Sequence, residues 1–258
     1  MGTVKFDFSG ERYVVTGASS GMGRLAAVEL ARSGAEVLAL GRNNERLDAL
    51  RNEQPEKIFT ASLDVCDGQA LEQVTADFVS RHGKLKGGIH AAGVSGVMPF
   101  RDYDKETAEN IMNVNFWAGM NLLKLITRSK FGMPGTSTVL FSSVASVSPA
   151  KGMFAYAASK AALDGAVRSI SREIASKNHR VNTVMPGWVV TPMTDKLSTT
   201  VKVQEVLSTY SLGSGKPEDV IPMVMFLLSD AARWITGVSI IIDGGGGGLN
   251  FLDYLSAM

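Results

Sequence analysis

The chain has 258 residues, enough for one large α/β domain with a substantial buried core. Its 26 Lys and Arg residues nearly balance its 25 Asp and Glu residues, giving a net charge of +1. This balance excludes the clustered positive charge that nucleic-acid binding or electrostatic membrane binding requires. The single cysteine, Cys66, cannot form an internal disulfide and has no metal-ligand spacing. A reducing cytoplasm and no metal site are therefore expected. Residues 1–12 lack the apolar run of a secretory signal, and no apolar stretch reaches the roughly 18 residues of a membrane span.

Short runs rich in β-branched residues alternate along the chain with longer amphipathic segments. The expected strands are Tyr13–Thr16, Glu36–Leu40, Lys57–Val65, Gly88–Ala92, Ser137–Ser142, Arg180–Met185 and Ser239–Asp243. The expected helices are Gly21–Ser33, Asn43–Glu53, Asp67–His82, Asp104–Lys130, Gly152–Lys177 and Pro217–Ser229. This order predicts an α/β fold, a doubly wound parallel sheet (Rossmann fold) of about seven strands with helices on both faces. Because no linker or repeat divides the chain, residues 1–258 are expected to form a single domain.

A glycine-rich turn joins the first strand to the first helix. Such a turn lets backbone N–H groups and the helix N-terminus receive a diphosphate, where a side chain would block the approach. A tight turn without a ligand is the alternative. The expected cofactor contacts in this turn are Gly17, Ser19, Ser20, Gly21, Met22 and Gly23.

The end of the second strand bears on the choice between NAD and NADP. An acid about 20 residues beyond the glycines would bind the ribose 2′-hydroxyl of NAD, but Gly41, Arg42 and Asn43 stand there instead. A guanidinium can pair with a 2′-phosphate, so Arg42 and Asn43 favour NADP(H), with NAD(H) still open. A solvated arginine at a strand end is the competing interpretation.

Two further strand ends carry candidate cofactor contacts. Asp64, followed by Val65, can accept a hydrogen bond from the adenine amino group, or it can cap the helix that begins near Asp67. The small residues Ala91, Ala92 and Gly93 leave room for a ribose. His90 precedes them without an acidic partner in the sequence, which favours a structural role over a general base.

Tyr156 and Lys160 carry the strongest chemical signal, because residues four apart on a helix share one face. A neighbouring cation stabilises a phenolate and draws the phenol pKa from about 10 towards neutrality. Ser143 stands 13 residues before Tyr156 at the end of the fifth strand, where the ligands of parallel sheets bind. The spacing favours Ser143 over its neighbour Ser142 as the hydroxyl that binds a carbonyl oxygen. A capping serine is the alternative role.

These motifs, together with Asn115, Pro186-Gly187 and the closing Asp243-Gly244-Gly245, resemble the short-chain dehydrogenase/reductase family from about Phe6 to Gly245. The likeness is to NADP-preferring 3-oxoacyl reductases. It implies that Asn115 holds a water in a proton relay, that Lys160 binds the nicotinamide ribose, and that Ser143 orients the carbonyl. It further implies that the nicotinamide is lined by Pro186, Gly187, Val189 and Thr191.

Two positions depart from the family pattern. The chain has His90-Ala91-Ala92-Gly93 where the family often has Asn-Asn-Ala-Gly, which removes two asparagines that usually brace this loop. Ser20 stands where many NADP-preferring relatives have a basic residue, which weakens the case for NADP. Neither departure affects the four residues expected to be catalytic, which are Asn115, Ser143, Tyr156 and Lys160.

The substrate side is less determined by the sequence. Residues 188–216 are expected to form a lid, and their apolar content favours an apolar carbonyl substrate unless these side chains pack the lid's own core. The candidate substrate contacts are Ser143, Val94, Ala145, Met153, Tyr156 and Trp188. The apolar tail, residues 249–258, either folds back or docks on a neighbouring subunit, and the resemblance implies a homo-oligomer, either a dimer or a tetramer.

The expected function is NAD(P)H-dependent reduction of a ketone to a secondary alcohol, or the reverse, with hydride from nicotinamide and a proton from Tyr156. The alternatives are an NAD-dependent alcohol dehydrogenase of the same fold and a non-catalytic NADP-binding sensor. The expected partner is a small-molecule carbonyl or alcohol substrate, with no nucleic acid and no membrane. Five consecutive glycines, Gly244 to Gly248, exceed the family's closing turn, and only a flexible connection to the tail accounts for Gly246 to Gly248.

Overall fold

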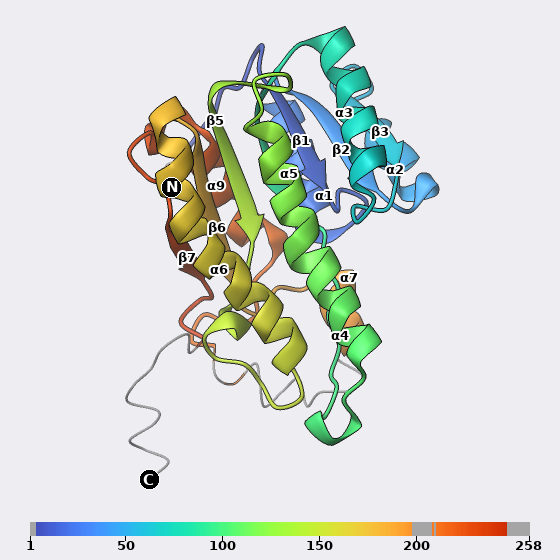
Figure 1. Cartoon of the computed structure of the whole chain (residues 1–258), viewed down its shortest axis with the longest axis vertical. Helices are drawn as coiled ribbons and strands as arrows, with labels where there is room; N and C mark the ends of the chain where they lie inside the picture. The colour runs from blue at the N-terminus through green and yellow to red at the C-terminus, as the bar shows by residue number, and fades with distance from the viewer. Residues whose placement is uncertain (1–3, 198–207, 209, 247–258) are drawn as a thin grey trace.

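Seven strands form one parallel sheet in the order β3-β2-β1-β4-β5-β6-β7, and the five inner strands are mostly buried. The computed structural model describes residues 4–197, 208 and 210–246 (Figure 1). The strands are β1 (Arg12–Thr16), β2 (Glu36–Gly41), β3 (Ile58–Ser62), β4 (Leu85–His90), β5 (Gly132–Phe141), β6 (Arg180–Pro186) and β7 (Ser239–Ile242). Every residue of β6 is buried, as expected for a strand covered on both faces. The predicted doubly wound sheet is confirmed.

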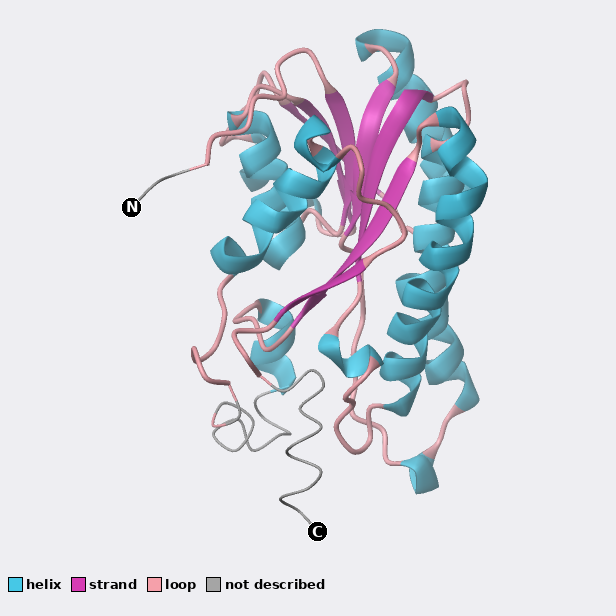
Figure 2. Ribbon diagram, turned by 90° about the vertical axis from the view of Figure 1, so that its left-hand side faces the viewer, coloured by secondary structure: helices cyan, strands magenta, loops and turns pink. Residues whose placement is uncertain are grey.

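Helices cover both faces of the sheet (Figure 2). On one face, α1 (Gly21–Arg32), α2 (Asn44–Arg51) and α9 (Pro217–Leu228) contribute to the largest buried apolar cluster. On the other, α3 (Gly68–His82) and α5 (Ala118–Ile126) pack on the sheet beside α6 (Phe154–Ile174). The shorter elements are α4 (Lys105–Met112), α7 (Pro192–Leu197), a π turn (Asn113–Trp117) and 3-10 turns at Phe100–Asp102, Val144–Ser146, Ala175–Lys177 and Asp230–Ala232.

Local sequence explains where several helices begin. The Asn43 side chain accepts a hydrogen bond of 2.8 Å from the Arg46 N–H at the start of α2. The Asp67 carboxylate accepts bonds of 3.0 Å from the Gln69 and Ala70 N–H groups at the start of α3. Asp67, and not Asp64, is therefore the cap of α3.

Several predicted elements have different bounds in the structure; β5, for example, begins at Gly132 and not at Ser137. The single helix expected over Asp104–Lys130 is interrupted by the π turn, whose residue Asn115 is held by bonds to other segments. The strand expected over Lys57–Val65 ends at Ser62, because Ser62 pairs with Gly41, the last residue of the neighbouring strand β2. The strand expected over Gly88–Ala92 is shifted back to Leu85–His90. Partners distant in the chain set the ends of these elements. The local sequence pattern does not show where those partners lie.

Two expected features fall partly or wholly outside the described residues. The middle of the predicted lid, at positions 198–207 and 209, lies outside them, and so does the whole of the tail 249–258. Among the helices that are described, none is long and apolar enough to cross a membrane.

Candidate active site

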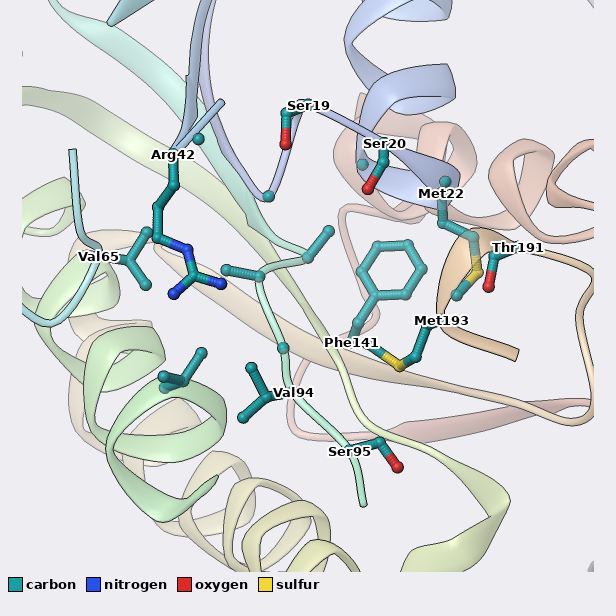
Figure 3. A pocket seen from close by; sticks show the side chains of 18 of the residues that line it. Ser19, Ser20, Met22, Arg42, Val65, Val94, Ser95, Phe141, Thr191 and Met193 are labelled. Carbon is teal, nitrogen blue, oxygen red and sulfur yellow. The ribbon is translucent and has the colours of Figure 1, made fainter. Parts of the chain in front are cut away.

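A cavity of about 640 Å³ opens at the carboxyl ends of the central strands (Figure 3). Figure 3 shows Arg42 and Val65 on one side of it, and Met22, Phe141, Thr191 and Met193 on the other. The sequence-predicted residues that line it are Gly17, Ser19, Ser20, Gly21, Met22, Gly23, Arg42, Asn43, Asp64, Val65, Ala91, Ala92, Gly93, Val94, Tyr156, Lys160 and Thr191.

The remaining predicted residues do not line this cavity. They are Asn115, Ser143, Ala145, Met153, Pro186, Gly187, Trp188 and Val189. Sequence reasoning missed Gly41, Arg46, Leu63, Ser95, Gly96, Val114, Phe141, Ser142, Pro192 and Met193. The sequence does indicate Arg46, because it is a second arginine in the first turn of α2, only four residues after Arg42. Phe141 and Val114 had none, because their places depend on how β5 and the π turn pack.

The three glycines of the first turn serve different purposes. A Cβ on Gly17 would lie 2.5 Å from the Ala92 nitrogen, and one on Gly23 would lie 2.5 Å from the Gly17 oxygen. Both glycines are thus required by packing inside the protein. Gly21 has a φ of 55°, and the nearest atom to a Cβ there would be a Thr191 methyl at 3.5 Å. Among these three glycines, Gly21 is the one whose missing side chain leaves open space in the cavity.

The N-terminus of α1 faces this cavity without a side-chain cap. Ser20 occupies the capping position but makes no side-chain hydrogen bond, and the first turn has no acidic residue. Free N–H groups and the helix dipole favour an anion at this point. The cavity, the missing Gly21 side chain and the uncapped α1 therefore fit the diphosphate of a dinucleotide.

The part of the cavity near the end of β2 holds two exposed arginines, Arg42 and Arg46. Asp64 lies at the same end, where its carboxylate accepts a hydrogen bond of 2.9 Å from the Cys66 N–H. Gly41, at the end of β2, leaves room for Ser19, because a Cβ there would lie 3.0 Å from the Ser19 Cβ. Two cations and one carboxylate therefore surround this end.

Tyr156 and Lys160 line the same cavity from the first turns of α6, and Lys160 lies at the end of β5, three strands away from β2. The Lys160 ammonium donates a 2.7 Å hydrogen bond to the Phe141 carbonyl and lies 5.6 Å from the centroid of the Tyr156 ring. Burial lowers the pKa of Lys160 to about 8, against the opposing effect of Asp164. Burial also raises the pKa of Tyr156, and a hydrogen bond with Ser143 acts in the opposite direction. Burial therefore outweighs the expected lowering at Tyr156 in this structure.

The two candidate serines point to different partners. The Ser142 hydroxyl donates to the Asp164 carboxylate at 2.8 Å, so it is turned into the protein. Ser143 interacts with Tyr156, and its oxygen also accepts a 3.2 Å bond from the Ala145 N–H. The capping role and the contact with Tyr156 thus coexist at Ser143.

Asn115 braces the loop that follows β4. Its side-chain oxygen accepts from the Val94 N–H at 2.8 Å, and its amide donates to the Val94 carbonyl at 3.0 Å and to Ser159 at 2.9 Å. The side chain is fully buried and does not reach the cavity wall. Its observed contacts are therefore those of a brace between the π turn, this loop and α6.

His90 replaces one of the family's bracing asparagines. Its ring bonds to the Thr16 hydroxyl at 2.9 Å and to the Val114 carbonyl at 3.2 Å. Burial, together with the nearby Lys160 charge, lowers the pKa of His90 to about 3, so the ring is neutral. A buried, neutral and doubly bonded histidine has the structural role that the sequence favoured. Within the described residues there is also no cluster of three His, Cys, Asp or Glu side chains that could hold a metal.

A doubly wound sheet with a glycine turn, a cavity at the strand ends and a Tyr–Lys pair defines a nucleotide-binding oxidoreductase. The sequence model of the family described as "Enoyl-(Acyl carrier protein) reductase" matches residues 17–246. The chain belongs to this family, and so to the short-chain dehydrogenases/reductases. It is an oxidoreductase that acts on carbonyl and alcohol groups with a nicotinamide cofactor.

Similar proteins cover nearly the whole chain. A 3-oxoacyl-[acyl-carrier-protein] reductase from Thermotoga maritima is 33% identical over 92% of this chain and 97% of its own. An L-xylulose reductase from Caenorhabditis elegans is 31% identical over 93% and 97%, respectively. The crystal structure of a short-chain dehydrogenase/reductase from Brucella melitensis superposes with a TM-score of 0.88 at 31% identity, covering 94% of this chain and 98% of that one.

Proposed function

We propose that this protein reduces a ketone to a secondary alcohol with NADPH, and that Tyr156 supplies the proton. The observation that carries the proposal is one cavity lined both by Arg42 and Arg46, after β2, and by Tyr156 and Lys160, which lie at the end of β5 three strands away. When bound, the nicotinamide supplies the hydride. The similarity to a 3-oxoacyl reductase and to an L-xylulose reductase supports a carbonyl substrate.

The residues at the nicotinamide end divide the remaining work. Lys160 binds the ribose hydroxyls beside Gly93, where a Cβ would lie only 3.6 Å from the lysine nitrogen. Ser143 orients the carbonyl oxygen, and Tyr156 donates its proton to that oxygen as negative charge develops. Because burial raises the pKa of Tyr156, the phenol holds its proton at neutral pH. The protonated phenol is the form that can donate to a carbonyl oxygen.

The proton donor is tested by the variant Tyr156→Phe. Turnover should fall at least about a hundredfold, the usual scale for a lost general acid, while NADPH still binds. Tyr103→Phe is the matched control, because Tyr103 is an exposed tyrosine that does not line the cavity. The assay is NADPH oxidation against a panel of β-ketoacyl thioesters, sugars, steroids and small ketones. Near-normal turnover of Tyr156→Phe would overturn the assignment, and no oxidation with any substrate despite tight cofactor binding would support a non-catalytic sensor.

The preference for NADP(H) over NAD(H) rests on the two arginines and on the absence of an acid at the end of β2. Arg42→Ala and Arg46→Ala should each lower kcat/KM for NADPH while leaving kcat/KM for NADH nearly unchanged. Arg51→Ala is the control, since Arg51 lies on the same helix, pairs with Asp48 at 3.0 Å and lies outside the cavity. A wild-type preference for NADH that neither change alters would refute the 2′-phosphate site.

We also propose a cytoplasmic homo-oligomer whose residues 188–216 cover the substrate side. Thr191, Pro192 and Met193 at the cavity edge support the lid. Trp117 and Trp234 are 54% and 97% exposed, and large exposed apolar side chains of this kind are typical of subunit contacts. Light scattering coupled to size-exclusion chromatography measures the oligomer directly, and a monomer at micromolar concentration would contradict it.

A further inference from the structure

A buried carboxylate, Asp164, lies on α6 one helical turn beyond Lys160, and its side chain is outside the site described above. It accepts hydrogen bonds from Thr183 on β6 at 2.6 Å, from Ser142 at the end of β5 at 2.8 Å, and from Ser239 on β7 at 3.0 Å. Asp164 is 5% exposed. Three hydroxyls from three strands thus converge on one carboxylate beneath the active site.

This set of donors suits a carboxylate at Asp164. A carboxylate offers only acceptor positions, and each of the three hydroxyls has one proton to give. A protonated Asp164 would itself have to donate and would compete with one of those bonds. The surroundings therefore hold a negative charge inside the protein, where the cost of burying it is offset by the three bonds.

The nearest buried charge of opposite sign is Lys160, which is 4% exposed. No direct ion pair joins the two among the described residues, so Asp164 acts on Lys160 through space. Asp164 is the group that opposes the effect of burial on the Lys160 pKa. The other titratable neighbours of Lys160 are Tyr156 on its own helix and the neutral His90 on β4.

Other elements packed against α6 add little charge near Lys160. The charged side chains of α4, Lys105, Glu106 and Glu109, are exposed to solvent. On β6, the Arg180 guanidinium is bonded to backbone carbonyls around the end of α9. Asp164 is therefore the charged group best placed to influence Lys160.

Asp164 also fixes the chain at the end of β5. Ser142, which donates to Asp164, stands between Phe141 and Ser143. The Phe141 carbonyl accepts the Lys160 ammonium bond, and Ser143 interacts with Tyr156. The carboxylate is thus bonded to the one residue that separates two groups of the site.

We propose that Asp164 is a positioning residue of the reaction, a buried anion that keeps Lys160 as an ammonium ion and holds the end of β5 in place. The inference rests on the proposed function, because it assigns Asp164 a role through Lys160. An apolar residue at this position would cost less stability than a buried charge. The effect on Lys160 gives the protein a chemical reason to keep a charged residue there.

The test is the variant Asp164→Asn, which removes the charge and keeps the shape. The basic limb of the kcat/KM profile for reduction should move to lower pH by about one unit, because the ammonium loses its neighbouring anion. The pH at which NADPH binding weakens should move in the same direction in a fluorescence titration, which does not depend on turnover. A uniform loss of kcat/KM with both pH values unchanged would overturn the proposal and leave a structural role.

Ser239→Ala is the matched control, because it removes one hydrogen bond to Asp164 but leaves the charge. It should lower the unfolding temperature without moving either pH value, and a shift equal to that of Asp164→Asn would overturn the charge argument. If Asp164→Asn does not fold, the triple variant Asp164→Ala, Thr183→Val, Ser239→Ala removes the acceptor together with two donors. Ser142 then still has the Lys160 carbonyl, at 3.2 Å, as its acceptor. The same shifts are expected in this variant, and their absence would refute the proposal.

Failure of this inference differs from failure of the proposed function. If Tyr156→Phe keeps normal turnover, the proposed function fails, whatever Asp164 does. If Tyr156→Phe is inactive and the charge-free Asp164 variants titrate as the wild type does, only the role of Asp164 fails.

Discussion

Gly17 and Gly21 belong to one short turn, yet replacing Gly17 by alanine should act mainly on stability, and replacing Gly21 mainly on cofactor binding. In Gly17→Ala the new methyl would lie 2.5 Å from the Ala92 nitrogen and 2.7 Å from the Ala91 carbonyl carbon, at a φ of 69°. Overpacking costs about 1–3 kcal/mol. The left-handed conformation adds about 1–2 kcal/mol. The free energy of unfolding should therefore fall by about 2–5 kcal/mol.

In Gly21→Ala the methyl meets only Thr191, at 3.5 Å, so the conformational cost of about 1–2 kcal/mol stands alone. The methyl projects into the cavity at the N-terminus of α1, where the diphosphate is proposed to bind. The Kd for NADPH should rise at least about tenfold, equivalent to about 1.4 kcal/mol. Gly21→Ala should thus be a folded protein with weak cofactor binding.

Urea unfolding and NADPH fluorescence titration on both variants separate the two effects. Gly165→Ala is the internal control, because this exposed glycine of α6 has no atom within 4 Å of a new methyl. That change should raise the free energy of unfolding by up to about 1 kcal/mol through helix propensity. If Gly21→Ala binds NADPH as tightly as the wild type, the assignment of the diphosphate to this turn is refuted.

Three further outcomes are expected. Arg180→Met removes a guanidinium, 8% exposed, that donates at 2.8 Å to Leu227 and 3.0 Å to Ser229, and urea unfolding should show a loss of about 3–5 kcal/mol. Lys160→Met should raise the free energy of unfolding at pH 7 by about 1–3 kcal/mol. The reason is that the Lys160 pKa of about 8 in the folded protein lies below its unfolded value, so the buried ammonium costs stability at pH 7. The free energy of unfolding of the wild type should therefore rise between about pH 8 and pH 10.5. Above that range the difference in stability between the variant and the wild type should vanish. Gly246→Ala would press a methyl into the Tyr210 ring and should destabilise by about 1–3 kcal/mol, a cost that disappears in a Tyr210→Ala background when both are measured as a double-mutant cycle.

Much of the fold could be predicted from the chain alone. Alternating β-branched and amphipathic segments indicated seven strands and a parallel sheet, because a strand buried on both faces needs continuous apolar residues. The glycine turn, Arg42 and the four-residue spacing of Tyr156 and Lys160 are also local, and all of them line the cavity. A local sequence pattern is enough to predict a site residue when the helix or turn that carries the residue also determines its position.

Other features depended on partners distant in the chain. The interruption of the expected helix at Asn115 is accompanied by bonds to Val94 and Ser159, which are 21 and 44 residues away. The part of the glycine run that had no explanation in the sequence gains one at Gly246, since the Tyr210 ring leaves no room for a side chain there. No sequence periodicity indicates that Asn115 will contact Val94 and Ser159, or that Gly246 will lie against Tyr210.

The sequence by itself determined the class of fold and the family, and it predicted the residues that would hold the cofactor. Only the tertiary structure decided that Ser142 turns towards Asp164, why Gly17 and Gly23 cannot carry a side chain, and that Asp164 collects hydroxyls from β6, β7 and the end of β5. The physical reason is the range of the interactions. Hydrophobic periodicity and turn chemistry act over a few residues, whereas a buried polar group is satisfied by whichever distant strand the sheet brings beside it.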